Sequence, residues 1–376
     1  MIYLDYSATT PVNDAVLNSF CEVTKKYIGN PNSLHELGIK SNELIRAATE
    51  QISNILNIKS NEIIYTSGAS ESNNLALKGI SYKYSNRGKH IITTEFEHSS
   101  IYGPISYLQK EGFEIDFVKT LKDGMIDIEN LKELIRNDTI LVSIASVNSE
   151  IGLRQNIENI AKIVKNKNPR CLFHSDMTQI IGKEKIDLKN VDLASFSAHK
   201  FFGIKGIGCL IKKEKILLEP IIHGGKSTTI YRSGTPCVAL IVSLAKALRL
   251  SYHNIDEKYE KVVILNELLK EKLSKYKHVK INSNNNSIPH ILNISVIGVK
   301  PETMQHALEE YQIYISTQTA CSSHSTHSRS VMALTGDLER ASSSIRISLS
   351  HLTTEKECKE FLKAFDICYN KLTNLR

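Results

Sequence analysis

Short apolar runs alternate with amphipathic helical patterns over most of the chain, from about Asn13 to Leu250. The runs have the length of strands and are rich in Ile and Val. Several lack the alternation of a half-exposed strand, which indicates burial on both faces. The clearest runs are 62–66, 90–94, 139–146, 171–175 and 193–197. This order predicts an α/β domain around a mainly parallel sheet, with functional side chains at the carboxyl ends of its strands.

A second, smaller set of elements follows the Thr235-Pro236 step. The pattern predicts a long helical stretch to about Lys277, a charged terminal helix from Thr354, and strands at 278–282, 290–296, 313–316 and 344–349. We therefore expect three parts. A segment over 1–15 packs near the active site, a large domain covers 16–252, and a smaller α/β domain covers 253–376.

Composition narrows the class of protein. With 376 residues, 41% hydrophobic and 23% charged, the chain is typical of a folded globular protein of about two domains. It has neither the roughly 18-residue apolar run of a membrane helix nor a secretory signal at its start. Seven scattered cysteines without a C-x-x-C pair suggest a reducing, cytoplasmic location. A net charge of +7 without a basic block predicts no direct nucleic-acid binding.

Two strand ends carry residues suited to a charged cofactor. Asp176 ends a buried strand, where a carboxylate either pairs with a cation such as a pyridinium or caps the next turn. Lys200 ends another apolar strand, beside Phe201 and several glycines. It is either a desolvated amine that bonds a carbonyl cofactor or a surface lysine.

An upstream turn at 66–71, Thr-Ser-Gly-Ala-Ser-Glu, lies between a strand and a helix. Its helix N-terminus either holds a phosphate or is an ordinary cap. The strand-end His98 adds a group that can lie over a ring. A lysine, an acid, a phosphate cradle and a ring-stacking group are together the parts of a pyridoxal phosphate enzyme, so the combination favours that interpretation.

The segment 316–330 contains nine Ser or Thr residues among fifteen, so we expect an exposed, mobile loop. It carries Cys321, whose thiolate would be favoured by His324, His327 or Arg329. Besides a nucleophile, the C-x-x-H-x-x-H spacing allows a metal site, but no second ligand pair lies near in sequence and we expect no metal. A plain exposed cysteine is the third alternative.

Arg346 lies within the apolar strand expected at 344–349. A guanidinium there binds a carboxylate by two points, and that carboxylate belongs either to a substrate or to an internal Asp or Glu. The sequence leaves both open.

Taken together, the motifs resemble those of the cysteine desulfurases, the NifS/IscS-like group of the class V aminotransferase fold. The resemblance runs nearly end to end and rests on the segments 4–11, 29–33, 66–71, 97–98, 147–152, 176–179, 197–200, 232–235 and 320–322. It implies the pyridoxal-phosphate transferase fold type I, with a large cofactor-binding domain and a small domain that carries the cysteine loop.

The resemblance also implies residue roles. Lys200 would hold pyridoxal 5'-phosphate covalently, Asp176 would pair with its ring nitrogen, and His98 would stack on the ring and shuttle protons. Gln179 would hydrogen-bond the phenolic oxygen. The phosphate would be held by Ala69, Ser70, Ser197 and His199, with Thr235 reaching in from the other subunit of a homodimer. The substrate would be bound through its carboxylate by Asn148 and Arg346, with Asn148 also contacting the cofactor.

The implied reaction converts L-cysteine to L-alanine and leaves the sulfur on Cys321 as a persulfide. An acceptor protein of iron–sulfur cluster assembly, tRNA thiolation or thiamin synthesis would then receive it. The alternatives are a selenocysteine lyase-type enzyme and a partner-docking scaffold with little turnover. The chain departs from the family pattern at 226–231, at Gln318 and at Cys237, so we expect the cross-subunit loop, the cysteine loop and the dimer-side contacts to differ from those of the family.

Overall fold

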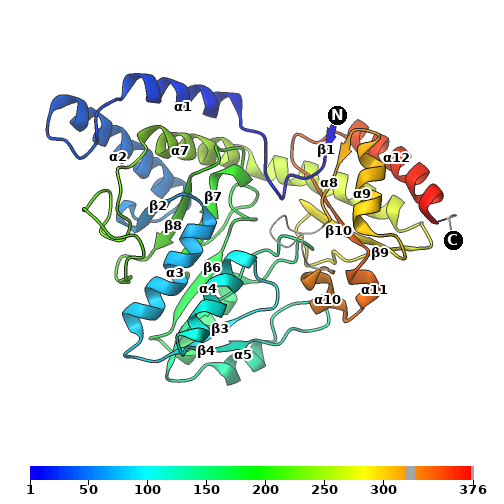
Figure 1. The fold of residues 1–376 in the computed structure, drawn as a ribbon, viewed down its shortest axis with the longest axis horizontal. Coiled ribbons are helices and arrows are strands. Elements are labelled where there is room, and N and C mark those ends of the chain that lie inside the picture. The colour runs from blue at the N-terminus through cyan, green and yellow to red at the C-terminus, as the bar shows by residue number, and fades with distance from the viewer. Residues whose placement is uncertain (318–326, 374–376) are drawn as a thin grey trace.

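The computed structural model describes residues 1–317 and 327–373. A larger α/β part and a smaller part lie side by side in Figure 1, and the chain begins on the smaller part before it crosses to the larger one.

A seven-stranded sheet forms the centre of the larger part, with strand order β2-β8-β7-β6-β5-β3-β4. Its strands are β2 Ile63–Thr66, β3 His90–Thr93, β4 Glu114–Phe117, β5 Thr139–Ser143, β6 Leu172–Asp176, β7 Leu193–Ser197 and β8 Gly208–Lys212. The pairs from β4 through β3, β5 and β6 to β7 are parallel, whereas β8 runs antiparallel to β7 and β2. The predicted α/β fold with a mainly parallel sheet is confirmed.

Neighbouring residues of the central strands belong to different hydrophobic clusters, because successive side chains of a strand point to opposite faces. Ile92 and Val142 pack in one cluster, and Ile91 and Leu141 pack in another. Helices cover both faces, which is why these strands lack a polar alternation. The helices of the larger part are α1 Asp14–Lys26, α2 Glu36–Leu56, α3 Ala69–Tyr84, α4 Ser99–Lys110, α5 Ile128–Leu134, α6 Ile157–Lys167 and α7 Val238–Tyr252.

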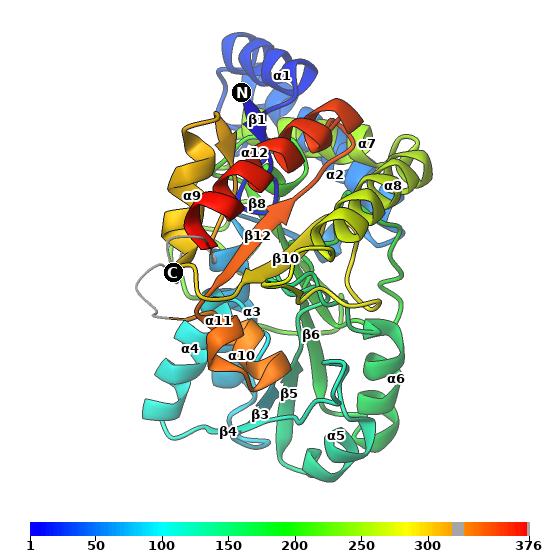
Figure 2. The same cartoon turned by 90° about the vertical axis from the view of Figure 1, so that its right-hand side faces the viewer.

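The smaller part has its own core around an antiparallel sheet of order β12-β10-β9. Its elements are α8 Ile255–Leu273, β9 Val279–Ile281, β10 Ile291–Val296, α9 Pro301–Glu309, α10 Arg329–Thr335, α11 Leu338–Ala341, β12 Ser344–Ser348 and α12 Glu355–Thr373. Figure 2 shows β10 beside β12, with α8, α9 and α12 packed around them. Side chains such as Leu269, Phe361 and Phe365 fill the space between helices and sheet.

Two expectations for this region need correction. The single helical stretch expected to about Lys277 is two helices, α7 and α8, because Asn254 takes a left-handed conformation with φ of 52°. The strand expected at 313–316 meets the sheet of the smaller part only through an isolated antiparallel bridge from Ser316 to Arg346 of β12. Its first residues form β11 Ile313–Tyr314, which pairs in parallel with β1 Ile2–Tyr3 at the start of the chain.

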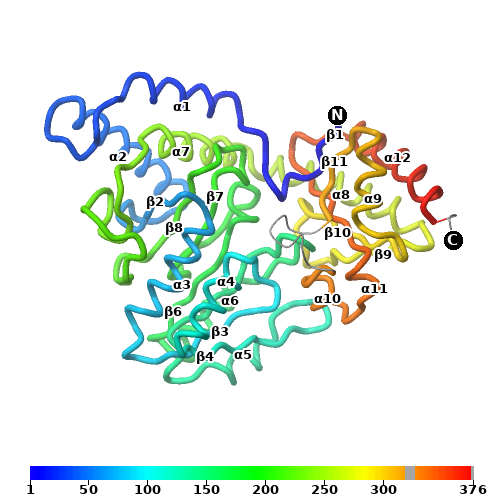
Figure 3. The backbone as a smooth tube through the Cα atoms, viewed as in Figure 1, coloured from blue at the N-terminus to red at the C-terminus, as the bar shows by residue number. Residues whose placement is uncertain are grey.

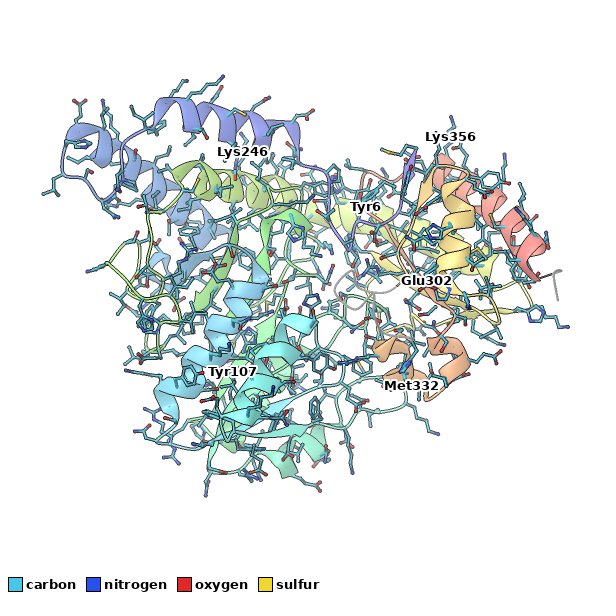
Figure 4. All side chains as sticks on the ribbon, viewed as in Figure 1. Tyr6, Tyr107, Lys246, Glu302, Met332 and Lys356 are labelled. Atoms are coloured by element: carbon cyan, nitrogen blue, oxygen red, sulfur yellow. The ribbon has the colours of Figure 1, made fainter. Side chains whose placement is uncertain are left out.

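The N-terminal segment connects the two parts. After β1 it makes an isolated bridge from Asp5 to Ser348, and Thr10 then donates a backbone hydrogen bond to the carbonyl of His199 at 2.9 Å. The tube in Figure 3 follows this path from the smaller part to α1. Tyr6, labelled in Figure 4, lies at the junction, with its ring 6.3 Å from that of Phe202.

Within the described ranges, no helix combines the length and the apolar character that crossing a bilayer requires.

Candidate active site

A pocket of about 430 Å³ opens at the carboxyl ends of the central strands, between the two parts. It gathers residues from strand ends, from the start of α3 and α4, from the N-terminal segment and from β12. The predicted site residues that line it are Ala69, Ser70, His98, Asp176, Gln179, Ser197, His199, Lys200 and Arg346. Residues that the sequence separates by more than 270 positions therefore share one cavity.

Lys200 ends the short 3-10 helix Ala198–Lys200 (η2), which directly follows β7. Its Nζ donates to the carbonyl oxygens of Ser7 at 2.7 Å and Ala8 at 2.8 Å. The N-terminal segment therefore places two acceptors at the amine, and the amine is held at the pocket wall rather than in bulk solvent.

Asp176 is the last residue of β6, and only 7% of its surface is exposed. Asn73 Nδ2 donates to its Oδ2 at 2.8 Å, and the backbone N–H of Thr178 donates to its Oδ1 at 2.9 Å. These are neutral donors. A buried carboxylate held in this way is suited to pairing with a cationic group inside the pocket.

His98 caps the N-terminus of α4 through its ring. The backbone N–H of Ser100 donates to Nδ1 at 3.2 Å, so in the neutral ring the proton lies on Nε2. Burial lowers the pKa of His98; the charge of Asp176 opposes this effect, and those of Lys200 and Arg346 add to it. The ring is therefore neutral at pH 7 and can accept or pass a proton.

The N-terminus of α3 points its dipole at the pocket, with Gly68 as the capping residue. Ala69 donates its backbone N–H to Ser197 Oγ at 2.6 Å, which ties the turn to the end of β7. His199 lies alongside, and burial, reinforced by Lys200 and Lys205, lowers its pKa to about 4. A helix N-terminus with nearby hydroxyls and a neutral imidazole provides hydrogen-bond donors for an anion such as a phosphate.

Arg346 is 2% exposed and lies in the middle of β12. Its guanidinium donates to Asp5 Oδ1 at 2.8 Å and to the carbonyl of Ser149 at 2.9 Å. Of the two alternatives that the sequence left open, an internal carboxylate partner is therefore present. The same side chain also lines the pocket, and its Nε is buried without a hydrogen-bond partner, so donor capacity remains.

Asn148 was expected to contact substrate and cofactor, but it is not among the residues that line the pocket. Its Nδ2 donates to the carbonyl of Phe96 and to Ser330 Oγ, both at 2.9 Å. Its Oδ1 accepts the backbone N–H groups of Glu150 and Ile151. In this conformation the amide holds the turn after Val147 together and has no unused N–H for a substrate.

Two more predicted residues lie apart from the pocket or outside the described ranges. Thr235 is exposed and does not line the pocket of its own chain. Cys321 lies outside the described residues, as do His324 and the Gln318 position. The metal alternative for the cysteine loop falls there as well. Within 1–317 and 327–373, no three His, Cys, Asp or Glu side chains gather closely enough to hold a metal ion.

The structure adds residues that sequence reasoning did not assign. Asn73 supports Asp176, the Ser7 and Ala8 carbonyls hold Lys200, and Lys183 donates to Gln179. Asn73 gave no signal because it lies inside a helix. The Ser7 and Ala8 contribution comes from backbone atoms, which every residue type shares.

Comparisons with known proteins match nearly the whole chain. Residues 2–361 match the family model "Aminotransferase class-V". The chain is 36% identical over 379 residues to the cysteine desulfurase IscS of Dictyoglomus turgidum, covering 100% of this chain and 96% of the relative. A solved "NIFS-LIKE PROTEIN" superposes with a TM-score of 0.92 at 36% identity, covering 97% and 98% of the two chains. The structure named "SspA in complex with cysteine" has a TM-score of 0.83 at 31% identity, covering 94% and 100%.

Proposed function

Because the chain belongs to the class V aminotransferase family as a NifS/IscS-like cysteine desulfurase, we propose that it converts L-cysteine to L-alanine and carries the sulfur on Cys321. The observation that supports this best is the single pocket shared by Lys200, Asp176 and His98. A solved structural relative named as a complex with cysteine supports the substrate.

The donor set of the pocket fits pyridoxal phosphate, the cofactor of this family. Asp176 is a buried carboxylate with only neutral donors among its hydrogen bonds, as a pyridinium partner requires. Lys200 would hold the cofactor covalently, and Gln179 would face its phenolic oxygen. The phosphate would be held at the start of α3 by Ala69, Ser70, Ser197 and His199. When bound, the cofactor supplies an electron sink that weakens the bond between Cβ and sulfur of the substrate.

The pocket residues then have separate tasks. When it is not bonded to the cofactor, the Lys200 amine would be the base for the substrate Cα proton, because it lies at the wall of the pocket. His98 relays protons from its Nε2 side. Arg346 receives the substrate carboxylate with the donors that Asp5 and Ser149 leave unused. Asn148 would contribute only after its present hydrogen bonds rearrange.

Sulfur transfer needs a nucleophile that can reach the substrate first and the acceptor protein afterwards. The Cys321 thiolate attacks the sulfur of the substrate, so a sulfur–sulfur bond forms while the bond from Cβ to sulfur breaks. The carbon fragment keeps the electron pair and takes up protons to become alanine. The persulfide is then available to an acceptor protein, for which iron–sulfur assembly or tRNA thiolation are the expected pathways. The Ser- and Thr-rich sequence around Cys321 supports this role.

We also propose a homodimer. The exposed position of Thr235, away from the pocket of its own chain, is consistent with a contact to the phosphate in a second subunit.

The test is alanine formation from L-cysteine in the presence of a thiol reductant, for the wild type and for Cys321→Ala. Cys21→Ala, at an exposed cysteine on α1, is the matched control. We expect full activity in the control and almost none in Cys321→Ala. Equal alanine from both variants would point to a direct lyase of the selenocysteine lyase type, and no alanine from any protein would favour a docking scaffold.

A further inference from the structure

Gln179 has a hydrogen-bond partner at each end of its amide. Lys183 Nζ donates to Oε1 at 2.8 Å, and Nε2 donates to the carbonyl oxygen of Ser7 at 3.0 Å. Gln179 is 4% exposed and lines the pocket. Lys183 follows Gln179 by four positions in the turn segment after β6, and the two side chains meet directly.

These two partners determine which way the amide faces. A lysine ammonium has three donors and no acceptor, and a carbonyl oxygen can only accept. A flipped amide would set Nε2 against the ammonium and Oε1 against the Ser7 carbonyl, so both hydrogen bonds would be lost together. The two neighbours therefore select one orientation, with Nε2 on the side of Ser7.

The acceptor in this arrangement is itself fixed. The Ser7 carbonyl also accepts from Lys200 Nζ at 2.7 Å. The Ser7 backbone N–H donates to Ser348 Oγ at 2.9 Å, and its hydroxyl donates to the carbonyl of Ser149 at 3.1 Å. Ser7 therefore cannot turn its carbonyl away without breaking contacts to three other residues.

The donor is equally confined. Lys183 follows Gly182, whose φ is +75° and where an added Cβ would lie 2.6 Å from the Cβ of Phe201. This close approach fixes the backbone from which Lys183 extends. Burial, with smaller contributions from Lys200 and Arg346, lowers the pKa of Lys183 to about 7, so it is below this pH that Lys183 is mainly the donor-only ammonium. The side chain lies behind the pocket, where it lines a small cavity of about 20 Å³ together with Lys200 and His290.

We propose that Lys183 is a positioning residue that orients the Gln179 amide so that its second N–H is presented to the pocket. This inference rests on the proposed function, since the recipient of that N–H would be the phenolic oxygen of pyridoxal phosphate. Without Lys183 only the Ser7 carbonyl still opposes the turned amide, in which Oε1 would face that oxygen and two acceptors would repel each other. Lys183 thereby favours the ionised phenolic oxygen of the cofactor through Gln179, without contacting the cofactor itself.

The test replaces Lys183 by Met, which keeps the length and removes the donor, and by Arg, which keeps a donor-only group. Lys185→Met is the matched control. It removes the same charge two residues further along the chain, where the lysine side chain is exposed and pairs with Asp256. Two readouts are used: the affinity of the apoprotein for pyridoxal phosphate, and the pH midpoint of the visible absorbance of the bound cofactor. Circular dichroism checks that each variant folds.

We expect Lys183→Met to weaken cofactor binding on the order of tenfold, as for the loss of one good hydrogen bond. The absorbance midpoint should rise by about one pH unit, because the phenolate oxygen loses a donor. Lys183→Arg should restore both readouts in large part, and Lys185→Met should change neither.

A double mutant separates positioning from a direct effect of charge. In a Gln179→Leu background, Lys183→Met should cause no further shift of the midpoint if Lys183 acts through the amide. An equal shift in both backgrounds would overturn the inference, as would wild-type behaviour of Lys183→Met. Wild-type protein that binds the cofactor but forms no alanine would contradict only the proposed reaction. Wild-type protein that binds no pyridoxal phosphate would overturn both.

Discussion

At the scale of single residues, burial decides the ionisation of the groups around the pocket. Glu97 directly precedes His98, yet it points into the protein and is 6% exposed. Its Oε1 accepts from the backbone N–H of Ala145 at 2.8 Å and from Thr94 Oγ1 at 2.9 Å, while its Oε2 is buried without a partner. Burial raises the pKa of Glu97 to about 8. The carboxyl is therefore largely protonated at pH 7, unlike an ordinary glutamate.

This raised pKa predicts a pH-dependent stability. Between the ordinary value of 4.5 and about 8, the unfolded chain has released the Glu97 proton and the folded chain keeps it. Stability should therefore fall as the pH rises through this window. Urea unfolding of the apoprotein at several pH values should show a shallower decline for Glu97→Gln than for the wild type. Parallel pH profiles for the two proteins would contradict this assignment.

The guanidinium of Arg346 predicts a second, separable effect. Lysine offers a point charge and cannot serve Asp5, the Ser149 carbonyl and a substrate carboxylate at once. Arg346→Lys should lower the free energy of unfolding by about 1–3 kcal/mol and raise KM for L-cysteine about tenfold or more. Arg340→Lys is the control, since Arg340 also makes a forked contact, to Asn282, but does not line the pocket. A KM that rises equally in both variants would argue against a substrate contact of Arg346.

At the scale of elements, two glycines allow the backbone at the start of α3 to approach β8 closely. A Cβ on Gly208 would lie 2.6 Å from the Cα of Gly68, the capping residue of α3, and 2.7 Å from the carbonyl oxygen of Phe196. Both neighbours are backbone atoms that cannot move aside cheaply. The antiparallel placement of β8 beside β7 thus brings a glycine under the turn that is proposed to bind phosphate.

Gly208→Ala should therefore lower the free energy of unfolding by about 1–3 kcal/mol and also weaken binding of pyridoxal phosphate. Gly103→Ala is the control, because a Cβ at this position in α4 would meet no atom within 4 Å. There the change should stabilise the helix by about 0.5–1 kcal/mol. Thermal unfolding and cofactor titration of both variants measure the two effects. Tight cofactor binding by Gly208→Ala would show that α3 tolerates the shift.

At the scale of the whole molecule, the N-terminal segment joins the smaller part to the pocket. Leu4 is fully buried in the hydrophobic core of the smaller part, whereas Ser7 and Ala8 accept from Lys200 in the pocket. Packing in one part therefore positions acceptors at the site of the other. The parallel pairing of β1 with β11 and the Asp5 contact to Arg346 reinforce this link.

Leu4→Ala should cost about 2–5 kcal/mol of stability, as for a large-to-small change in a core. It should also weaken cofactor binding, because the carbonyls at Lys200 lose their anchor. Leu17→Ala, at a 45% exposed site on α1, should change stability by no more than about 0.5 kcal/mol. Denaturant unfolding and cofactor titration provide the measurements. Unchanged cofactor affinity in a destabilised Leu4→Ala protein would mean that the pocket does not depend on this anchor.

The hydrophobic pattern predicted five of the seven strands of the larger sheet to within a few residues, because fully buried strands have a distinctive composition. It did not single out β4, an edge strand with a mixed sequence, or β8, which follows a glycine-rich turn. It also joined α7 and α8, since a single left-handed Asn254 leaves no strong sequence signal. Within the site, strand-end residues such as Asp176 and Lys200 were recognisable, and the family was identified correctly from local motifs.

The sequence by itself determined the fold class and the strand ends where polar side chains gather, since both depend on local composition and spacing, and it determined the family through the resemblance of its motifs. Only the tertiary structure showed that Arg346 has an internal carboxylate partner, because that partner, Asp5, lies 341 positions away in the sequence. It also decided the ionisation of Glu97 and the orientation of the Gln179 amide. Desolvation and hydrogen bonding depend on every neighbour in space, and those neighbours come from segments that the linear sequence keeps apart.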